Sequence, residues 1–162
     1  MKTEPSAGRS VSEGNVDAFL AEVIPMLERM DRELHDGNAG PRHEHWSHRD
    51  PVTLFGAVMT KRGWKEIGPA FDALATRFSD CASFQYEVVA ASVSGDLGYI
   101  AGLEHTTASV GGGPVETYHL RVTTILRREN GAWKVVHRHG DTPPETPETR
   151  DSLDRLTPAE SR

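Results

Sequence analysis

Residues 120–141 read LRVTTILRRENGAWKVVHRHGD, and this stretch decides the fold. Two runs rich in β-branched and other apolar residues flank the tripeptide ENG at 129–131, and a three-residue loop that ends in Gly is common in β-hairpins. The second run ends in HRHGD at 137–141, so polar side chains gather at the end of an apolar strand. The sequence therefore predicts a hairpin within a sheet that wraps a cavity, with polar groups at this end of it.

Helical spacing dominates the N-terminal part of the chain. From Ser12 to Leu34, apolar residues recur every three or four positions, which predicts one helix that Pro25 either kinks or divides. The expected elements after it are a short helical turn at 41–48, a strand at 50–55, a long helix at 63–78, and strands at 82–94, 97–110, 115–128 and 132–142. Helices followed by a run of antiparallel strands indicate an α+β fold.

The composition narrows the class of protein. A chain of 162 residues suits one domain, which we expect at 12–142, between a disordered N-terminus at 1–11 and an extended or disordered tail at 143–162. The net charge of −6 and the scattered basic residues argue against nucleic-acid binding, and no apolar run is long enough to span a bilayer. Because Cys81 is the single cysteine and no apolar leader is visible, we expect a cytoplasmic protein.

Several short motifs, taken together, resemble a known superfamily. They are Gly37-Asn38 after the first helix, DPVTLF at 50–55, Gly63 three residues before Glu66, GDLGY at 95–99, Arg121 two residues before Thr123, and GAWKVVHRH at 131–139. In this order they resemble the nuclear transport factor 2-like superfamily, which includes ketosteroid isomerases, SnoaL-like polyketide cyclases and the association domain of calcium/calmodulin-dependent kinase II. The resemblance covers about residues 12–142. It implies a cystatin-like cone, in which N-terminal helices pack on a strongly curved, mainly antiparallel sheet that encloses a pocket.

Alternation along the hairpin divides its residues between two faces. A loop at 129–131 pairs Arg128 with Ala132, and opposed residues share a face. By the resemblance, one face lines the pocket and the other is a convex surface used in a homodimer; a slip of one residue would exchange them. The predicted pocket residues are Trp46, Phe55, Tyr99, Leu103, His105, Tyr118, Leu120, Val122, Thr124, Val136 and Arg138. The predicted interface residues are Arg121, Thr123, Trp133, His137 and His139.

Two functions fit this pocket. In the first, the protein is a SnoaL-like isomerase, cyclase or dehydratase that needs no cofactor, with His105 as the base and Tyr118 and Arg138 stabilising an oxyanion. Arg138 then favours a small organic ligand with an anionic or carbonyl oxygen. In the second, the protein is a non-catalytic ligand-binding or assembly module, and Arg138 pairs with a carboxylate such as Glu104 or Glu116.

Two further chemistries do not fit the residues. Ketosteroid isomerases use an Asp base, a Tyr and a protonated Asp. At the matching positions this chain has Phe55, Met30 and Thr124, which argues against that reaction. The histidines at 43, 45 and 48 lack the spacing of a zinc-protease helix, so no metal site is expected there.

Overall fold

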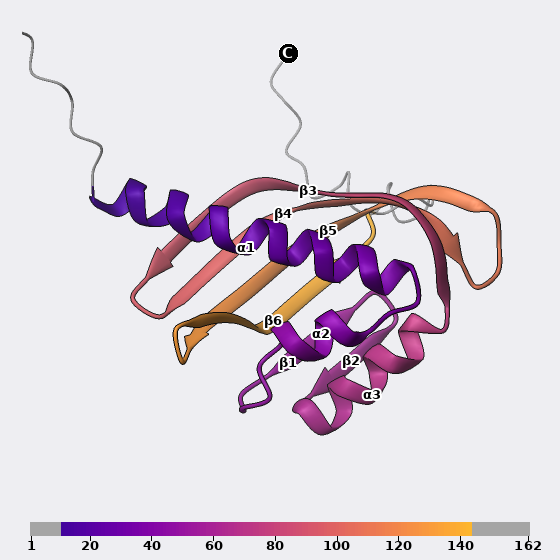
Figure 1. The fold of residues 1–162 in the computed structure, drawn as a ribbon, viewed down its shortest axis with the longest axis horizontal. Coiled ribbons are helices and arrows are strands. Elements are labelled where there is room, and N and C mark those ends of the chain that lie inside the picture. The colour runs from indigo at the N-terminus through magenta and orange to yellow at the C-terminus, as the bar shows by residue number, and fades with distance from the viewer. Residues whose placement is uncertain (1–10, 144–162) are drawn as a thin grey trace, which may run out of the picture.

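The computed structural model describes residues 11–143, which form three helices and a six-stranded sheet (Figure 1). The helices lie in the first half of this region and the long strands in the second, so the predicted α+β class is confirmed. The predicted termini, 1–11 and 143–162, lie outside the described region except for Val11, which begins α1, and Pro143.

The predicted first helix is confirmed as α1 (Val11–His35), and it runs unbroken through Pro25. Pro25 lies on the exposed side of the helix. Gly37, with a φ of 88°, follows the last turn in the left-handed conformation that glycine adopts most readily. The remaining helices are α2 (Gly40–His45) and α3 (Trp64–Ala75).

The sheet has the strand order β2-β1-β6-β5-β4-β3. Its strands are β1 (Thr53–Gly56), β2 (Met59–Arg62), β3 (Phe78–Ser94), β4 (Leu97–Val110), β5 (Val115–Glu129) and β6 (Ala132–Asp141). All neighbours are antiparallel except β1 and β6, which are parallel. Strand β2, which forms a hairpin with β1, was not predicted.

The loop between β5 and β6 contains two residues, not three. Glu129 pairs with Ala132, and the φ angles of Asn130 and Gly131 are 49° and 81°, as in a type I′ turn. The predicted pairing of Arg128 with Ala132 is therefore wrong by one residue. Asn-Gly is the preferred sequence for this tighter turn, because both central residues take a positive φ.

A bulge in β6 adds a second shift of register. It falls at Val136, between the pair of Leu126 with Val135 and the pair of Ile125 with His137. Beyond it, Arg138 pairs with Thr124 rather than with Val122 as predicted. The two shifts sum to two residues, so Arg138 still lies on the predicted face of the sheet.

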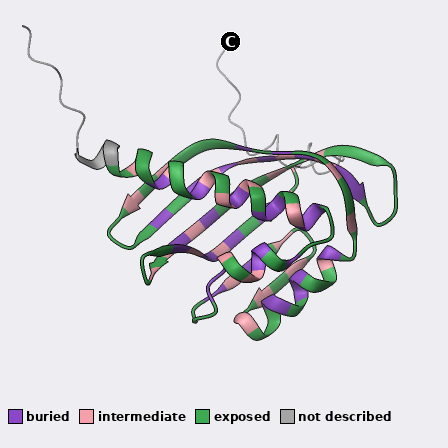
Figure 2. Ribbon diagram, viewed as in Figure 1, coloured by how far each residue is buried: buried purple, intermediate pink, exposed green. Residues whose placement is uncertain are grey.

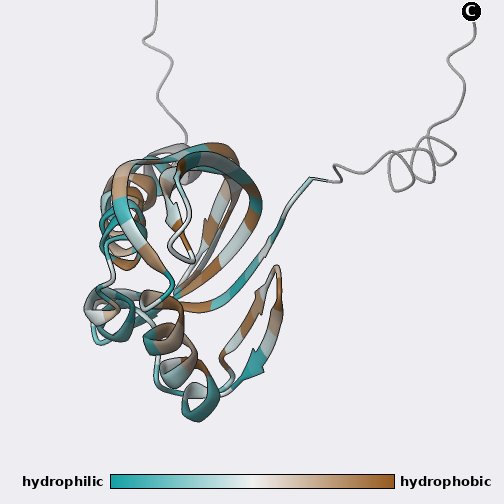
Figure 3. Ribbon diagram, turned by 90° about the vertical axis from the view of Figure 1, so that its right-hand side faces the viewer, coloured by the Kyte–Doolittle hydropathy of each residue, from teal (hydrophilic) through white to brown (hydrophobic). Residues whose placement is uncertain are grey.

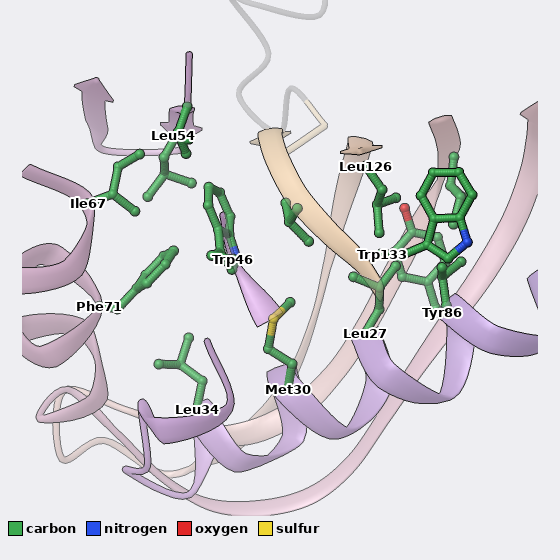
Figure 4. Packing of buried hydrophobic residues seen from close by; sticks show 14 of the residues in the cluster. Leu27, Met30, Leu34, Trp46, Leu54, Ile67, Phe71, Tyr86, Leu126 and Trp133 are labelled. Carbon is green, nitrogen blue, oxygen red and sulfur yellow. The ribbon is translucent and has the colours of Figure 1, made fainter. Parts of the chain in front are cut away.

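The sheet is strongly curved, and α1 packs against its concave face (Figure 1, Figure 3). In Figure 4, Leu27, Met30 and Leu34 project from α1 into the space between the helix and the rest of the core. The rings of Trp46 and Phe71 meet edge to face there, with centroids 4.9 Å apart. Each fully buried side chain of this size stabilises the fold by about 1.5–3 kcal/mol.

Buried and exposed residues alternate along the middle strands of the sheet (Figure 2), so one face of the sheet is covered and the other carries exposed side chains. Within residues 11–143, none of the helices combines the length and apolar character needed to cross a membrane.

Candidate functional site

Strand β4 brings polar residues to the concave face. Ile100, Glu104 and Thr106 are buried there, whereas Tyr99 is 42% exposed on the convex face. The prediction that Tyr99, Leu103 and His105 line the pocket is therefore wrong by one position in the alternation. The resemblance implied that orientation, and the alternation of β4 does not correct it, because the outward residues are more apolar than most of the inward ones, which include two glycines.

His105 lies on the convex face, away from the pocket side. Its Nδ1 lies 2.7 Å from Nδ1 of His119, its partner in β5, and its Nε2 lies 2.8 Å from a carboxylate oxygen of Glu87. The predicted base is thus part of a surface hydrogen-bond chain, and it cannot act on a ligand held on the concave face.

Arg138 and Glu104 form a buried ion pair on the concave face. Nη2 of Arg138 donates to Oε2 of Glu104 at 2.6 Å, and the two side chains are 9% and 3% exposed. Burial raises the pKa of Glu104, and the guanidinium opposes that rise. Burial alone would lower the pKa of Arg138, but the Glu104 carboxylate raises it. Arg138 therefore faces the predicted side, and a carboxylate of the protein already neutralises it.

Two glycines make room for this arrangement. Gly102 and Gly140 both pair with Val122, so the three residues form one row across the concave face. A Cβ on Gly140 would lie 2.8 Å from Nη1 of Arg138, and a Cβ on Gly102 would lie 2.8 Å from Cε1 of Tyr86. The Arg138 guanidinium and the Tyr86 ring thus lie over backbone, in space that side chains would fill.

The second feature of the site is a hydrogen-bonded pair of His35, at the end of α1, and Tyr118, on β5. Nδ1 of His35 lies 2.6 Å from the carbonyl oxygen of Asp31, and its Nε2 is in close hydrogen-bonding contact with the Tyr118 hydroxyl. A carbonyl only accepts, so Nδ1 carries the proton and Nε2 accepts from Tyr118. Burial lowers the pKa of His35 and raises that of Tyr118 to about 12, so both are uncharged at neutral pH.

A second buried ion pair joins the two helices at this site. The Arg42 guanidinium of α2 contacts the Asp31 carboxylate of α1, and it also lies over the Phe71 ring, 4.8 Å from the centroid. We call the whole set the concave polar cluster. Its members are Asp31, His35, Arg42, Tyr86, Glu104, Thr106, Tyr118 and Arg138.

Two hydroxyls in the cluster are buried without a hydrogen-bond partner among the described residues, namely Tyr86 Oη and Thr106 Oγ1. Tyr86 is near Thr124, and Thr106 is near Tyr118, but neither hydroxyl completes a hydrogen bond. Burial raises the pKa of Tyr86, so its hydroxyl keeps its proton. Buried polar groups are almost always hydrogen-bonded, so these hydroxyls are the ones most available to a ligand.

The other predicted pocket residues are divided between several environments. Leu120, Val122 and Thr124 lie on the concave face of β5, as does Tyr118. Val136 is the buried bulge residue of β6. Trp46 is buried against Phe71 in the core, and Phe55 lies outside, with its ring against His137 and His139.

The predicted interface residues lie on the convex face, with one exception. Arg121 is paired there with Asp141 at 3.0 Å, Thr123 is exposed, and His137 shares a hydrogen bond with Thr53. Trp133 is instead buried against Phe19, with ring centroids 4.9 Å apart. Its placement was predicted wrongly because the loop is one residue shorter than expected, so Trp133 pairs with Arg128 and not with Arg127.

An open groove of about 370 Å³ crosses this convex face. Val89, Ala101 and Leu103 form its apolar wall, and Arg121, His139 and Asp141 contribute polar atoms.

Sequence reasoning did not identify Asp31, His35 or Arg42 as members of the site. Asp31 and His35 had a signal, because two polar residues four apart sit beside the apolar stripe of α1 and so face the core. Glu104 was considered only as a salt-bridge partner, and the structure assigns it that contact. Across residues 11–143, no three His, Cys, Asp or Glu side chains converge as metal ligands would.

Comparison with known proteins identifies the family and the fold. The family model described as a SnoaL-like domain matches residues 27–144. No protein with curated annotation matches the sequence.

Three solved structures illustrate the likeness of fold. One, from Streptomyces avermitilis, belongs to the NTF2-like family and is provisionally named a dehydratase; it is 17% identical, with a TM-score of 0.64 over 80% of this chain and 99% of that one. An NTF2-like superfamily protein from Salmonella enterica is 14% identical, with a TM-score of 0.64 over 90% and 99%. A protein from Xanthomonas campestris, provisionally named a calcium/calmodulin-dependent protein kinase II association domain, is 14% identical, with a TM-score of 0.57 over 90% and 99%.

Proposed function

This chain belongs to the SnoaL-like domain family, and we propose that it binds a small organic molecule at the concave polar cluster and transfers protons on it without a cofactor. The reaction class is that of an isomerase, cyclase or dehydratase; one structural neighbour is provisionally named a dehydratase. The observation that carries the proposal is the His35–Tyr118 pair, held in one tautomer beside buried hydroxyls without partners.

The fixed tautomer makes Tyr118 the group that receives a proton. Because the Tyr118 hydroxyl donates to Nε2 of His35, its oxygen lone pairs remain for the ligand. A proton taken from a carbon next to a carbonyl moves to the Tyr118 oxygen as the phenolic proton moves to His35. His35 becomes an imidazolium, next to the Asp31 carbonyl and near its carboxylate. His35 acts through Tyr118 and is a positioning residue; Tyr118 touches the ligand.

The enolate that forms needs donors for its oxygen. The hydroxyls of Tyr86 and Thr106 are uncharged, buried and without partners among the described residues, so each can donate to that oxygen. Oriented donors in a site that excludes water stabilise such a charge strongly. The proton on the Tyr118–His35 pair then returns to another carbon in an isomerisation, or leaves with a hydroxyl group as water in a dehydration.

The test is deuterium uptake in D₂O, followed by proton NMR, at the carbons next to the carbonyl of cyclohexanone, 2-cyclohexenone and 1-tetralone. We expect the wild type to exceed Tyr118→Phe in exchange rate by about 10²–10⁴-fold on at least one ketone, the usual contribution of a positioned acid–base group. Tyr99→Phe, on the convex face, is the matched control and should keep the wild-type rate. Equal rates for the wild type and Tyr118→Phe on all three ketones would contradict the proposal.

The convex face supports a second role, which is self-association. Tyr99 and Val89 are large apolar residues exposed on this face of the sheet, by 42% and 69%. They lie on the same strands as the apolar wall of the convex groove. We propose a homodimer through this face, with Arg121, Thr123, His137 and His139 at the interface, and a cytoplasmic location. Dimerisation is compatible with catalysis, because the concave cluster lies on the other side of the sheet.

A further inference from the structure

The charges of the concave polar cluster cancel. Arg42 is paired with Asp31, and Arg138 is paired with Glu104. Among the described residues, these four are the Asp, Glu, Lys or Arg residues that are buried. His35 is uncharged because burial lowers its pKa, and Tyr86 and Tyr118 keep their protons because burial raises theirs. The cluster therefore has two positive and two negative charges and no net charge at neutral pH.

The charge of each guanidinium is already balanced by a carboxylate of the protein. Nη2 of Arg138 reaches Oε2 of Glu104 at 2.6 Å, and its Nε lies 3.4 Å from Oε1, so the carboxylate spans the guanidinium. Arg42 contacts Asp31 and lies over Phe71. An anionic ligand would have to displace one of these carboxylates or add an uncompensated charge to a buried site. Either event costs several kcal/mol, because a buried ion without a partner loses its hydration.

The uncharged atoms that remain for a ligand are the hydroxyls of Tyr86 and Thr106 and the oxygen of Tyr118. Nε of Arg42 is also buried without a partner among the described residues, but the charge of its guanidinium is already balanced by Asp31. Hydroxyl groups donate to and accept from carbonyl and hydroxyl oxygens. Val122 and the glycine row next to these groups offer only apolar or backbone surface.

We infer that the ligand of the concave site is an uncharged molecule that presents carbonyl or hydroxyl oxygens on an apolar carbon frame. This inference rests on the proposed function, because it assumes that the concave cluster is the ligand site. Of the two ligand classes that Arg138 suggests in the sequence, anionic and carbonyl, the ion pair with Glu104 favours the second.

A single substitution should create an anion site in the cluster. Glu104→Gln removes one negative charge with little change of shape and leaves the Arg138 guanidinium buried without a carboxylate. A ligand carboxylate then replaces the missing one. Glu104 thus acts as a specificity-determining residue, whose charge decides whether the site accepts a neutral or an anionic ligand.

The experiment compares two probes of nearly equal shape, benzamide and benzoate, at neutral pH. Binding is followed through the Nε–H signal of Arg138 in protein labelled with ¹⁵N-arginine, assigned by its loss in Arg138→Met. We expect the wild type to bind benzamide at least about 10-fold more tightly than benzoate, and Glu104→Gln to bind benzoate at least about 10-fold more tightly than the wild type does. Glu87→Gln, a carboxylate change on the convex face, is the matched control and should keep the wild-type preference.

Tighter binding of benzoate than of benzamide by the wild type would overturn the inference. So would a Glu104→Gln protein that binds neither probe, because the buried Arg138 guanidinium, left without a carboxylate, should attract benzoate. If Glu104→Gln fails to fold, Glu104→Asp replaces it; its shorter carboxylate should weaken the wild-type preference, and an unchanged preference would count against the inference. The proposed proton transfer is tested separately by deuterium uptake, so either result can fail alone.

Discussion

Breaking the Glu104–Arg138 ion pair is the sharpest test of the site. Both side chains are nearly inaccessible, at 3% and 9% exposed, and the guanidinium contacts the carboxylate at 2.6 Å. Glu104→Gln keeps the size of the side chain but leaves a buried positive charge that only a neutral amide contacts. Removal of one partner of a buried pair typically costs about 3–5 kcal/mol, because the other charge stays desolvated. We expect a loss of this size in the free energy of unfolding.

The assay is urea unfolding followed by tryptophan fluorescence. Trp46 and Trp133 are 1% and 3% exposed, so unfolding changes their environment. A domain of this size loses roughly 3–5 °C in Tm per kcal/mol, so a thermal scan should show a fall of roughly 9–25 °C. Glu87→Gln removes an exposed carboxylate that pairs with His105, and it should cost less than about 1 kcal/mol.

A double-mutant cycle separates the pair from other effects of the substitution. Arg138→Met should be destabilising alone, whereas Glu104→Gln combined with Arg138→Met should recover most of the loss, because no buried charge then lacks a partner. A loss below about 1 kcal/mol for Glu104→Gln, or additive effects in the double variant, would refute the reasoning. The ion pair would then be solvated more than the structure indicates.

Three further predictions concern the rest of the cluster and the convex face. His35→Gln should remove part of the pH dependence of stability. Burial lowers the pKa of His35 in the folded protein, so the wild type loses stability as pH falls below about 6.5, by up to about 1.4 kcal/mol per pH unit. If the unfolding free energy changed equally between pH 5.5 and 7.5 in the wild type and in His35→Gln, as measured by urea unfolding, the prediction would be wrong. Gly102→Ala would place a Cβ 2.1 Å from the carbonyl oxygen of Glu87 and should lower the free energy of unfolding by about 1–3 kcal/mol or more. Gly113→Ala, whose Cβ would lie 3.3 Å from its nearest neighbour, is the control, and equal unfolding midpoints for the two variants would count against the role of the glycine row. Tyr99→Glu should convert a dimer to a monomer in analytical ultracentrifugation, and an unchanged mass would exclude Tyr99 from the interface.

The fold was largely predictable because its elements have strong periodicity. The apolar stripe of α1 predicts a buried helix, and the alternation in β5 together with the Asn-Gly turn predicts the hairpin. Strand β2 was missed because residues 59–62 read MTKR, which is short and polar and resembles a loop. The bulge at Val136 leaves no mark in the sequence, since apolar residues occupy both 135 and 136.

The candidate site was predictable only in part. Tyr118, Thr124 and Arg138 were assigned to the concave face from the hairpin, and the structure puts them there. His105 was expected on that face from the resemblance, and the alternation of β4 did not reveal the error, because its outward side is more apolar than its inward side. The residue that lies there instead is Glu104, whose burial depends on Arg138, 34 positions away in the sequence. Alternation along β4 does not reveal that one of its residues forms an ion pair with a residue of β6.

Stability and ligand choice at this site depend on the same charge balance. A concave polar cluster with four buried ionic side chains is stable only if the charges are paired, and the same pairing leaves no unbalanced cation for an anionic ligand. If both statements are correct, Glu104→Gln should be stabilised by benzoate, because a ligand that binds only the folded protein adds RT ln(1 + [L]/Kd) to its stability. At a concentration 100 times Kd this amounts to about 2.7 kcal/mol, a large part of the loss expected from the substitution. Benzamide should restore less stability to Glu104→Gln. In the double variant, Glu104→Gln combined with Arg138→Met, benzoate and benzamide should have equal effects on stability. A benzoate effect of equal size in that double variant would show that the anion binds elsewhere.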